Sequence, residues 1–123
     1  MGQCFMEDRN ILELEAKLAN VAGKSVLEIG AGDGRLTAML LRHNPKKVFA
    51  VEKDQKFASI LKEKFASSPV DIIEDDFLKI KIPDVDIIIG NIPYYISSDI
   101  IFSLKDLDFE HAILMVRRNL HKR

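Results

Sequence analysis

Three glycines at alternate positions, Gly30, Gly32 and Gly34, follow an apolar run that begins at Ser25. The β-branched residues of this run predict a buried strand, and the glycines predict a tight turn with exposed backbone before a helix begins. Glycine tolerates φ > 0 and lets a ligand approach the backbone without meeting a Cβ. The segment therefore predicts a site for a nucleotide-like cofactor at the end of the first strand.

Polar side chains follow three other expected strands: Glu52, Asp76 and Asn91. Because ligands bind beyond the carboxyl ends of the strands in such sheets, we expect these groups to gather around the glycine turn. Glu52 lies 22 positions after Gly30 (52 minus 30), about the offset at which an acidic residue accepts hydrogen bonds from ribose hydroxyls. Two cofactors fit this pattern, a nicotinamide dinucleotide and S-adenosylmethionine.

The spacing of the glycines favours the second cofactor. A dinucleotide site expects G-x-G-x-x-G, in which the third glycine packs the helix on the strand. The run here is G-x-G-x-G, and with Glu28 it reads E-x-G-x-G-x-G, the pattern of adenosylmethionine-dependent methyltransferases.

The run Asn91-Ile92-Pro93-Tyr94 offers a site for a methyl acceptor. An adenine N6 amine is a poor nucleophile because its lone pair is delocalised into the ring. Two acceptors on a rigid turn, the Asn91 side-chain oxygen and a backbone carbonyl near Pro93, can draw it toward tetrahedral geometry. Tyr94 offers a stacking face for a base removed from its helix.

Length and composition indicate one globular domain over residues 1–123, with 47% apolar residues, 30% charged residues and a formal charge of −1. We divide it into an arm and helix at 1–24, an α/β core at 25–116 and a basic tail at 117–123. No apolar run of about 18 residues and no leader are seen, so we expect a cytoplasmic protein without a membrane segment. The single Cys4 agrees with a reducing compartment, and no cluster predicts a metal.

Apolar segments alternate with helical patterns along the chain, which predicts an α/β doubly wound sheet. Strands are expected at 25–29, 47–51, 70–73, 85–89 and 112–116. The nearly continuous apolarity of the fourth predicts that both faces of the sheet are covered.

Helical spacing predicts the buried faces of the helices. In the helix over 7–20 this face holds Ile11, Leu14 and Leu18. In the helix after the second strand it holds Phe57, Ile60, Leu61 and Phe65. We expect 90–95 to form a loop and Ser97 or Ser98 to cap the helix after it.

With these residues in place, the chain resembles the ribosomal RNA adenine N6,N6-dimethyltransferases, relatives of the erythromycin-resistance methylases. The single proline of N-I-P-Y is similar to the ribosomal RNA group rather than to enzymes with N-P-P-Y. The matching segments are GQCFMED at Gly2, VLEIGAGDGRLT at Val26, AVEKD at Ala50, DDFL at Asp75, GNIPYYISS at Gly90 and ILMV at Ile113.

The resemblance implies a Rossmann-like fold, S-adenosylmethionine as cofactor, and methylation of adenosines in small-subunit ribosomal RNA or a pre-ribosomal particle. The implied acceptor-site residues are Asn91, Pro93 and Tyr94. The implied cofactor-binding residues are Cys4, Met6, Gly30, Gly32, Glu52, Asp76 and Asn91.

The chain departs from the family after Val116, where Arg117 and Arg118 replace Q-x-E-F-like residues. Further strands and a helical RNA-binding domain are then expected to be missing. An alternative is therefore a non-catalytic module that binds the cofactor or a ribosomal precursor, and a third is a nicotinamide oxidoreductase. Because residues 112–116 would form an exposed edge strand, we also predict a homodimer.

Overall fold

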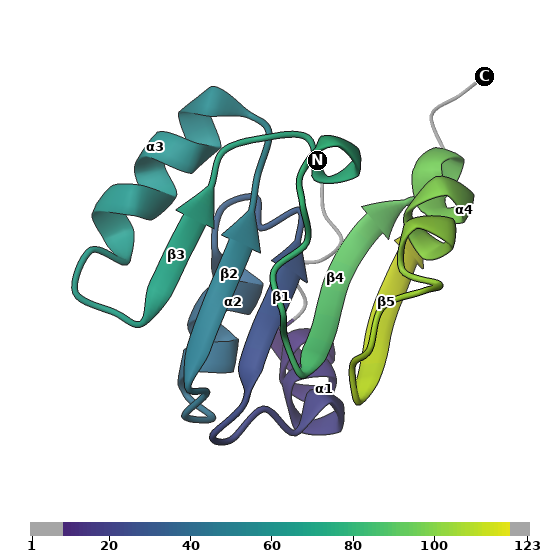
Figure 1. Cartoon of the computed structure of the whole chain (residues 1–123). Helices are drawn as coiled ribbons and strands as arrows, with labels where there is room; N and C mark the ends of the chain where they lie inside the picture. The colour runs from purple at the N-terminus through teal and green to yellow at the C-terminus, as the bar shows by residue number, and fades with distance from the viewer. Residues whose placement is uncertain (1–8, 119–123) are drawn as a thin grey trace.

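The computed structural model describes residues 9–118, and its central sheet is parallel throughout. The strands are β1 (Ser25–Ile29), β2 (Lys47–Val51), β3 (Val70–Ile73), β4 (Ile87–Pro93) and β5 (His111–Arg117). They lie in the order β3-β2-β1-β4-β5, and every neighbouring pair is parallel (Figure 1). All five carboxyl ends therefore meet at one edge, which confirms the predicted α/β doubly wound fold.

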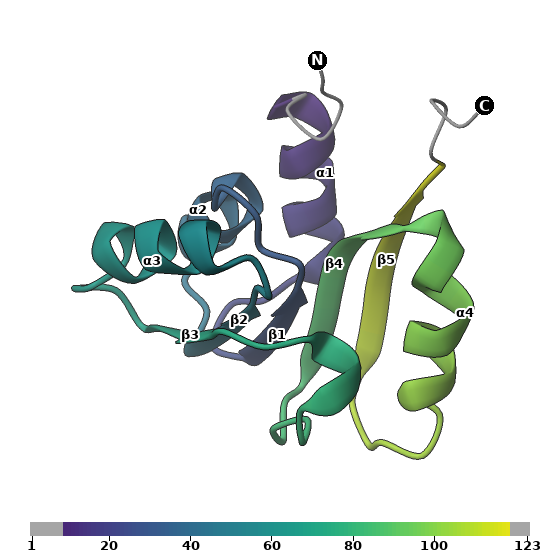
Figure 2. The same ribbon diagram turned by 90° about the horizontal axis from the view of Figure 1, so that it is seen from above.

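Helices cover both faces of the sheet. One face carries α1 (Arg9–Ala19), α2 (Arg35–Leu41) and α3 (Gln55–Lys64), and the other carries the 3₁₀ helix η2 (Phe77–Lys79) and α4 (Tyr94–Ser103) (Figure 2). Adjacent residues of β1 consequently enter different core clusters, with Val26 packed beneath the first group of helices and Leu27 beneath the second. Both are fully buried, as a parallel sheet between two helical layers requires.

The buried face of α1 is not the predicted one. Leu14 and Leu18 are 55% and 59% exposed, so the prediction of an Ile11, Leu14 and Leu18 face is wrong. The residues buried instead are Leu12, Glu15, Ala16 and Ala19. Both sets have helical spacing, and the small alanine side chains let the helix axis approach the sheet closely. Periodicity alone cannot choose between two such faces.

A hydrogen bond joins α1 to the edge strand β5. The His111 ring nitrogen Nε2 donates to the carbonyl oxygen of Ala19 at a distance of 2.9 Å. It satisfies one of the carbonyl groups that a helix leaves unpaired at its carboxyl end. The start of β5 therefore helps to fix the end of α1.

The buried face of α3 is only partly as predicted. Leu61 and Phe65 are buried, but Phe57 and Ile60 are 40% and 51% exposed. The helix packs against β3, an edge strand, so a narrower row of side chains, including Ala58, meets the sheet. The apolar side chains beside this row remain at the surface.

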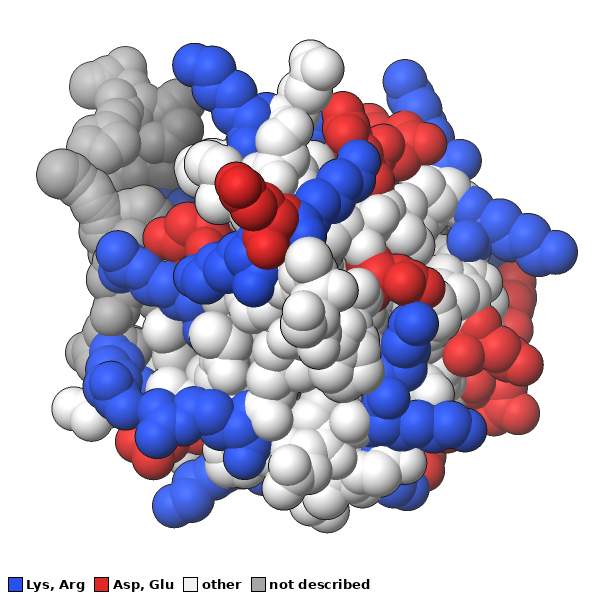
Figure 3. Space-filling model, turned by 90° about the vertical axis from the view of Figure 1, so that its left-hand side faces the viewer, with Lys and Arg blue, Asp and Glu red and all other residues white. Residues whose placement is uncertain are grey.

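Charged side chains of both signs lie on the α3 side of the molecule. Figure 3 looks at this side and shows Lys and Arg side chains interspersed with Asp and Glu side chains among uncharged residues. Lys56, Lys62 and Lys64 of α3 are exposed, and Lys62 pairs with Glu74 at 3.2 Å. This side of the molecule therefore carries charges of both signs, in keeping with a formal charge of only −1 for the chain.

The segment predicted to be a loop over 90–95 is instead the end of β4 and the start of α4. Pairing with β5 continues to Pro93, which lies opposite Arg117, and α4 begins at Tyr94. Pro93 is the residue before the helix, and the Ser97 hydroxyl donates to the Tyr94 carbonyl oxygen at 2.8 Å within it. The predictions that Ser97 or Ser98 caps the helix and that the strand ends at residue 89 are therefore wrong. Proline can end the strand because it needs no ladder donor there.

Candidate functional site

The glycine turn lies against the carboxyl end of β2. The backbone N–H groups of Gly30 and Ala31 both donate to the Val51 carbonyl oxygen, at 2.9 and 3.0 Å. Gly30 has φ of 72°, a conformation that residues with a Cβ adopt rarely. The turn is therefore held by backbone hydrogen bonds and requires glycine at its first position.

Glu52, the residue directly after β2, also holds the glycine turn. Its Oε1 accepts the Gly32 N–H at 2.7 Å, and its Oε2 accepts the Asp54 N–H at 2.9 Å. The side chain is only 9% exposed. Each oxygen has a second lone pair, so the carboxylate can anchor the turn and still accept from a ligand hydroxyl.

Gly30 and Asn91 lie side by side at the edge of the sheet. Ile29 of β1 pairs with Gly90 of β4. The residues that follow them, Gly30 and Asn91, therefore lie at the same height along the two parallel strands. A Cβ added to Gly30 would lie 3.6 Å from the Asn91 carbonyl oxygen. The structure thus places the glycine turn beside Asn91, because parallel strands in register end together.

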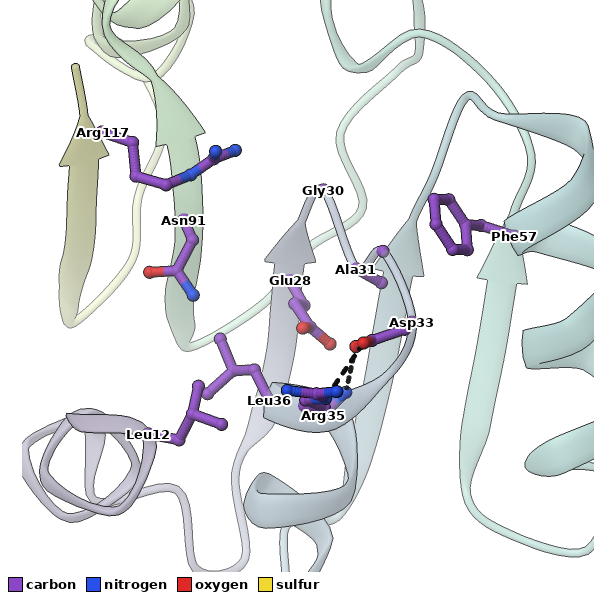
Figure 4. A pocket seen from close by; sticks show the side chains of 11 residues that line it. Leu12, Glu28, Gly30, Ala31, Asp33, Arg35, Leu36, Phe57, Asn91 and Arg117 are labelled. Carbon is purple, nitrogen blue, oxygen red and sulfur yellow. Dashed lines mark hydrogen bonds and ion pairs between the residues drawn. The ribbon is translucent and has the colours of Figure 1, made fainter. Parts of the chain in front are cut away.

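Two cavities meet at this point, with volumes of about 330 and 310 Å³. The residues that line both are Gly30, Gly32, Phe57, Asn91 and Arg117. Figure 4 shows the first cavity, which continues toward Leu12, Glu28 and Leu36. The second continues past Glu52 toward η2 and α4. An elongated ligand could therefore extend from one cavity into the other past Asn91.

Most of the predicted site residues that the structure describes line these cavities. Glu52, Asp76 and Pro93 line the second cavity, in addition to the shared glycines and Asn91. Tyr94 lines neither cavity and is 62% exposed, with the Arg118 guanidinium 6.0 Å from the centre of its ring. Tyr95 lines the second cavity instead. Cys4 and Met6 lie outside the described residues.

Asp76 has a structural contact as well as a position in the second cavity. Its Oδ1 accepts the Leu78 N–H at 3.0 Å and so caps η2. Asp75, one residue earlier, lines the same cavity and is exposed. The two adjacent carboxylates make this end of the cavity acidic.

Glu28 entered the sequence analysis only as the first residue of the E-x-G-x-G-x-G pattern, without a binding role, and the structure places it at the candidate site. It lines the first cavity, is 1% exposed, and burial raises its pKa from the ordinary 4.5 to about 8. The Thr37 hydroxyl donates to its Oε1 at 2.5 Å and lowers the pKa, whereas the charges of Glu15, Glu52 and Asp33 raise it. A cation bound here would favour the ionised carboxylate. The sequence feature that could have pointed to Glu28 is the presence of a glutamate within an otherwise apolar strand.

Arg117 and Phe57 are also new members of the site, because both line the two cavities. Arg117 is the last residue of β5, one position into the segment that we assigned to the tail, and its side chain extends toward Gly30 in Figure 4. Phe57 was predicted to be a core residue. The alternation of side chains along a strand could have indicated Arg117, whereas no sequence signal separates Phe57 from a core aromatic.

Two classes of structure are not found among residues 9–118. None of their helices has the length and apolar character that crossing a bilayer requires. They contain no group of three or more His, Cys, Asp or Glu side chains arranged to hold a metal ion.

The family model and the curated relatives agree on one family. The model of the family described as ribosomal RNA adenine dimethylase matches residues 1–123. The ribosomal RNA small subunit methyltransferase A of Pelagibacter ubique is 44% identical over 105 residues, which are 82% of this chain and 40% of that protein.

Two solved structures are similar to the whole fold. A dimethyladenosine transferase from Plasmodium falciparum superposes with a TM-score of 0.80 and 34% identity, covering 89% of this chain and 42% of that one. The 23S rRNA methyltransferase ErmE superposes with a TM-score of 0.83 and 28% identity, covering 93% and 48%. The chain spans less than half the length of each of these three relatives.

Proposed function

Because the chain belongs to the ribosomal RNA adenine dimethylase family, we propose that it transfers methyl groups from S-adenosylmethionine to adenine N6 in small-subunit ribosomal RNA. The observation that carries the proposal is the position of Asn91 beside Gly30, where the two cavities meet. An amide at that junction can contact a cofactor and a target base together. The family match favours this function over a nicotinamide oxidoreductase.

The residues present fit the proposed cofactor. Cavities of about 330 and 310 Å³ are within the range of small-molecule sites. In the second cavity, Glu52 would accept from the ribose hydroxyls and Asp76 from the adenine amine. In the first, Glu28 would accept from the ammonium group of the methionyl part. Gly30 leaves room for the chain of the ligand between them.

Asn91, Pro93 and Tyr94 would form the acceptor site. The bound cofactor supplies an electrophilic methyl group on a sulfonium. The Asn91 side-chain oxygen and a backbone carbonyl next to Pro93 would accept the two N–H groups of the target amine, which frees its lone pair for attack. Tyr94 has an exposed ring on which a displaced base could stack. As the N–C bond forms, the bond between sulfur and the methyl carbon would break, the leaving group would be a neutral thioether, and the nitrogen would lose one proton to water.

Calorimetry and methyl incorporation test this function. The chain should bind S-adenosylmethionine and not NAD, and should transfer labelled methyl groups to unmethylated small-subunit particles. Asn91→Ala should abolish transfer and leave cofactor affinity largely intact. Ser98→Ala, at an exposed position of α4 outside both cavities, should change neither methyl transfer nor cofactor affinity. Binding without any transfer by the parent chain would support a binding module, and transfer by Asn91→Ala would overturn the assignment of the acceptor site.

A further inference from the structure

Glu15 places a carboxyl group in the middle of the buried face of α1. It is 1% exposed and lies on the same face as Leu12, Ala16 and Ala19, which belong to a hydrophobic core cluster. Within residues 9–118, neither of its oxygens completes a hydrogen bond of ordinary length and angle. Such a group is unfavourable for folding. Its presence on this face needs a reason other than stability.

The side chain of Asn91 is the polar neighbour of Glu15. Burial raises the pKa of Glu15, and the Asn91 amide lies near enough to lower it in part. The Asn91 Oδ1 atom is itself buried and accepts no hydrogen bond in the described part of the chain. Glu15 lines neither cavity, whereas Asn91 lines both. Glu15 therefore reaches the site through Asn91.

The chemistry of the two groups couples the state of one to the orientation of the other. A primary amide has a donor edge and an acceptor edge. An ionised carboxylate only accepts, so it attracts the donor edge, whereas a protonated carboxyl can donate to the acceptor edge. The oxygen of Asn91 is buried in this structure, and a half-turn of the amide would exchange the two edges.

We propose that Glu15 is a positioning residue that sets which edge of the Asn91 amide faces the two cavities. The inference rests on the proposed function, in which the acceptor edge of Asn91 must meet the target amine. When Glu15 holds a proton, it can donate to the Asn91 oxygen and so hold the acceptor edge toward α1. When Glu15 is ionised, it attracts the Asn91 NH2 group, which leaves the acceptor edge free to face the cavities.

Other charged groups near α1 must be separated from Glu15 in any test. Those on neighbouring elements are Arg35 at the start of α2, Glu28 of β1, and His111 and Arg117 of β5. The charge of Glu15 raises the pKa of Glu28 through like-charge repulsion, so the titrations of the two groups are linked. A variant of Glu28 is therefore needed beside the variant of Glu15.

Nuclear magnetic resonance of the Asn91 side-chain amide tests the proposal on the ¹⁵N-labelled full chain. The signal is assigned by its loss in Asn91→Ala. In the parent chain it should shift with pH, with a midpoint above 4.5, the ordinary pKa of a glutamate. That step should disappear in Glu15→Gln and persist in Glu28→Gln and in Glu13→Gln, an exposed control on the same helix. An unchanged titration in Glu15→Gln would overturn the proposal.

Binding and transfer measurements separate a positioning role from a general structural one. Glu15→Gln should keep its affinity for S-adenosylmethionine within about twofold, while methyl transfer slows several-fold and its pH profile changes. Parallel losses of affinity and transfer would overturn the proposal. Glu15→Leu, which removes the buried carboxyl group, should remain folded. Its Asn91 side-chain amide signal should no longer show the shift with pH that Glu15 causes in the parent chain. If the parent chain transfers no methyl group, the proposed function fails, and the resonance titration still decides the role of Glu15.

Discussion

The carboxylate of Glu52 accepts the backbone N–H of Gly32 at 2.7 Å, so the end of β2 holds the glycine turn at the end of β1. Glu52→Ala would leave this N–H and that of Asp54 without their acceptor. We expect a loss of about 1.5–3 kcal/mol in the free energy of unfolding and a fall of about tenfold or more in S-adenosylmethionine affinity. Urea denaturation and calorimetry measure the two effects. Glu74→Gln, at the end of β3 and outside both cavities, is the control; it removes only the exposed pair with Lys62, so it should cost less than about 1 kcal/mol and leave the affinity unchanged.

Gly90 permits close approach of β4 to β1, and its replacement tests that spacing. A Cβ at Gly90 would lie 2.7 Å from the Ile29 carbonyl oxygen, so the two strands would have to separate. Gly90→Ala should destabilise the fold by about 1–3 kcal/mol and weaken cofactor binding, because moving Ile29 would displace the adjoining glycine turn that lines both cavities. Gly23→Ala introduces a Cβ at φ of 72° with no atom within 4 Å, and measures the backbone effect alone, about 1–2 kcal/mol. If cofactor affinity fell equally in both variants, the spacing argument would be wrong.

Glu28 should make the fold less stable as pH rises. Its pKa is about 8 in the folded chain and 4.5 as the ordinary value, so between these values the folded state binds a proton that the unfolded state has released. Linkage then requires the free energy of unfolding to decrease with increasing pH over this window. Glu28→Gln should make the free energy of unfolding depend less on pH. A smaller slope of the same sign should remain in this variant, because burial also raises the pKa of Glu15. Urea denaturation at several pH values checks this, and a slope of opposite sign would contradict it.

The predicted homodimer depends on the edge of the sheet. Within the described residues, β5 pairs only with β4, and Ala112 and Val116 on it are exposed. We propose that a second copy of this chain pairs along β5. Sedimentation at tens of micromolar should detect a dimer, and Ala112→Lys should dissociate it because charge on an edge opposes pairing. Ser98→Lys on α4 is the control. A monomeric parent chain would refute the proposal.

The order of elements could be predicted from sequence, whereas the faces of the helices could not. The strand at Lys47–Val51 has its predicted bounds because an apolar run between turn residues defines it locally. In α1, the stripes through Leu14 and Leu12 have the same period. Only packing against α2 and β5, which lie far along the chain, decides which stripe is buried. Tertiary contacts therefore settle what local spacing leaves open.

The same division applies to the site. Glu52 and Asn91 could be predicted because polar residues at the ends of parallel strands reach the same edge whatever the details of packing. Glu15 could not, because a glutamate on a helix is usually solvated, and its burial follows from the orientation of α1. Tyr94 is turned outward because β4 continues to Pro93 and the chain enters α4 at Tyr94, earlier than predicted. The sequence thus located the edge of the sheet more reliably than the direction of each side chain.

The hydrogen bond from His111 to Ala19 joins residues 92 positions apart, and this separation imposes an order on assembly during translation. Of the described elements, α1 leaves the ribosome before the strands, yet the partner of its final carbonyl group belongs to β5, the fifth of these strands. A nascent polypeptide can form the glycine turn early, but α1 cannot complete its docking until His111 has emerged. The Glu15 carboxyl group on α1 is thus brought fully into place beside Asn91 only when synthesis has passed the beginning of β5.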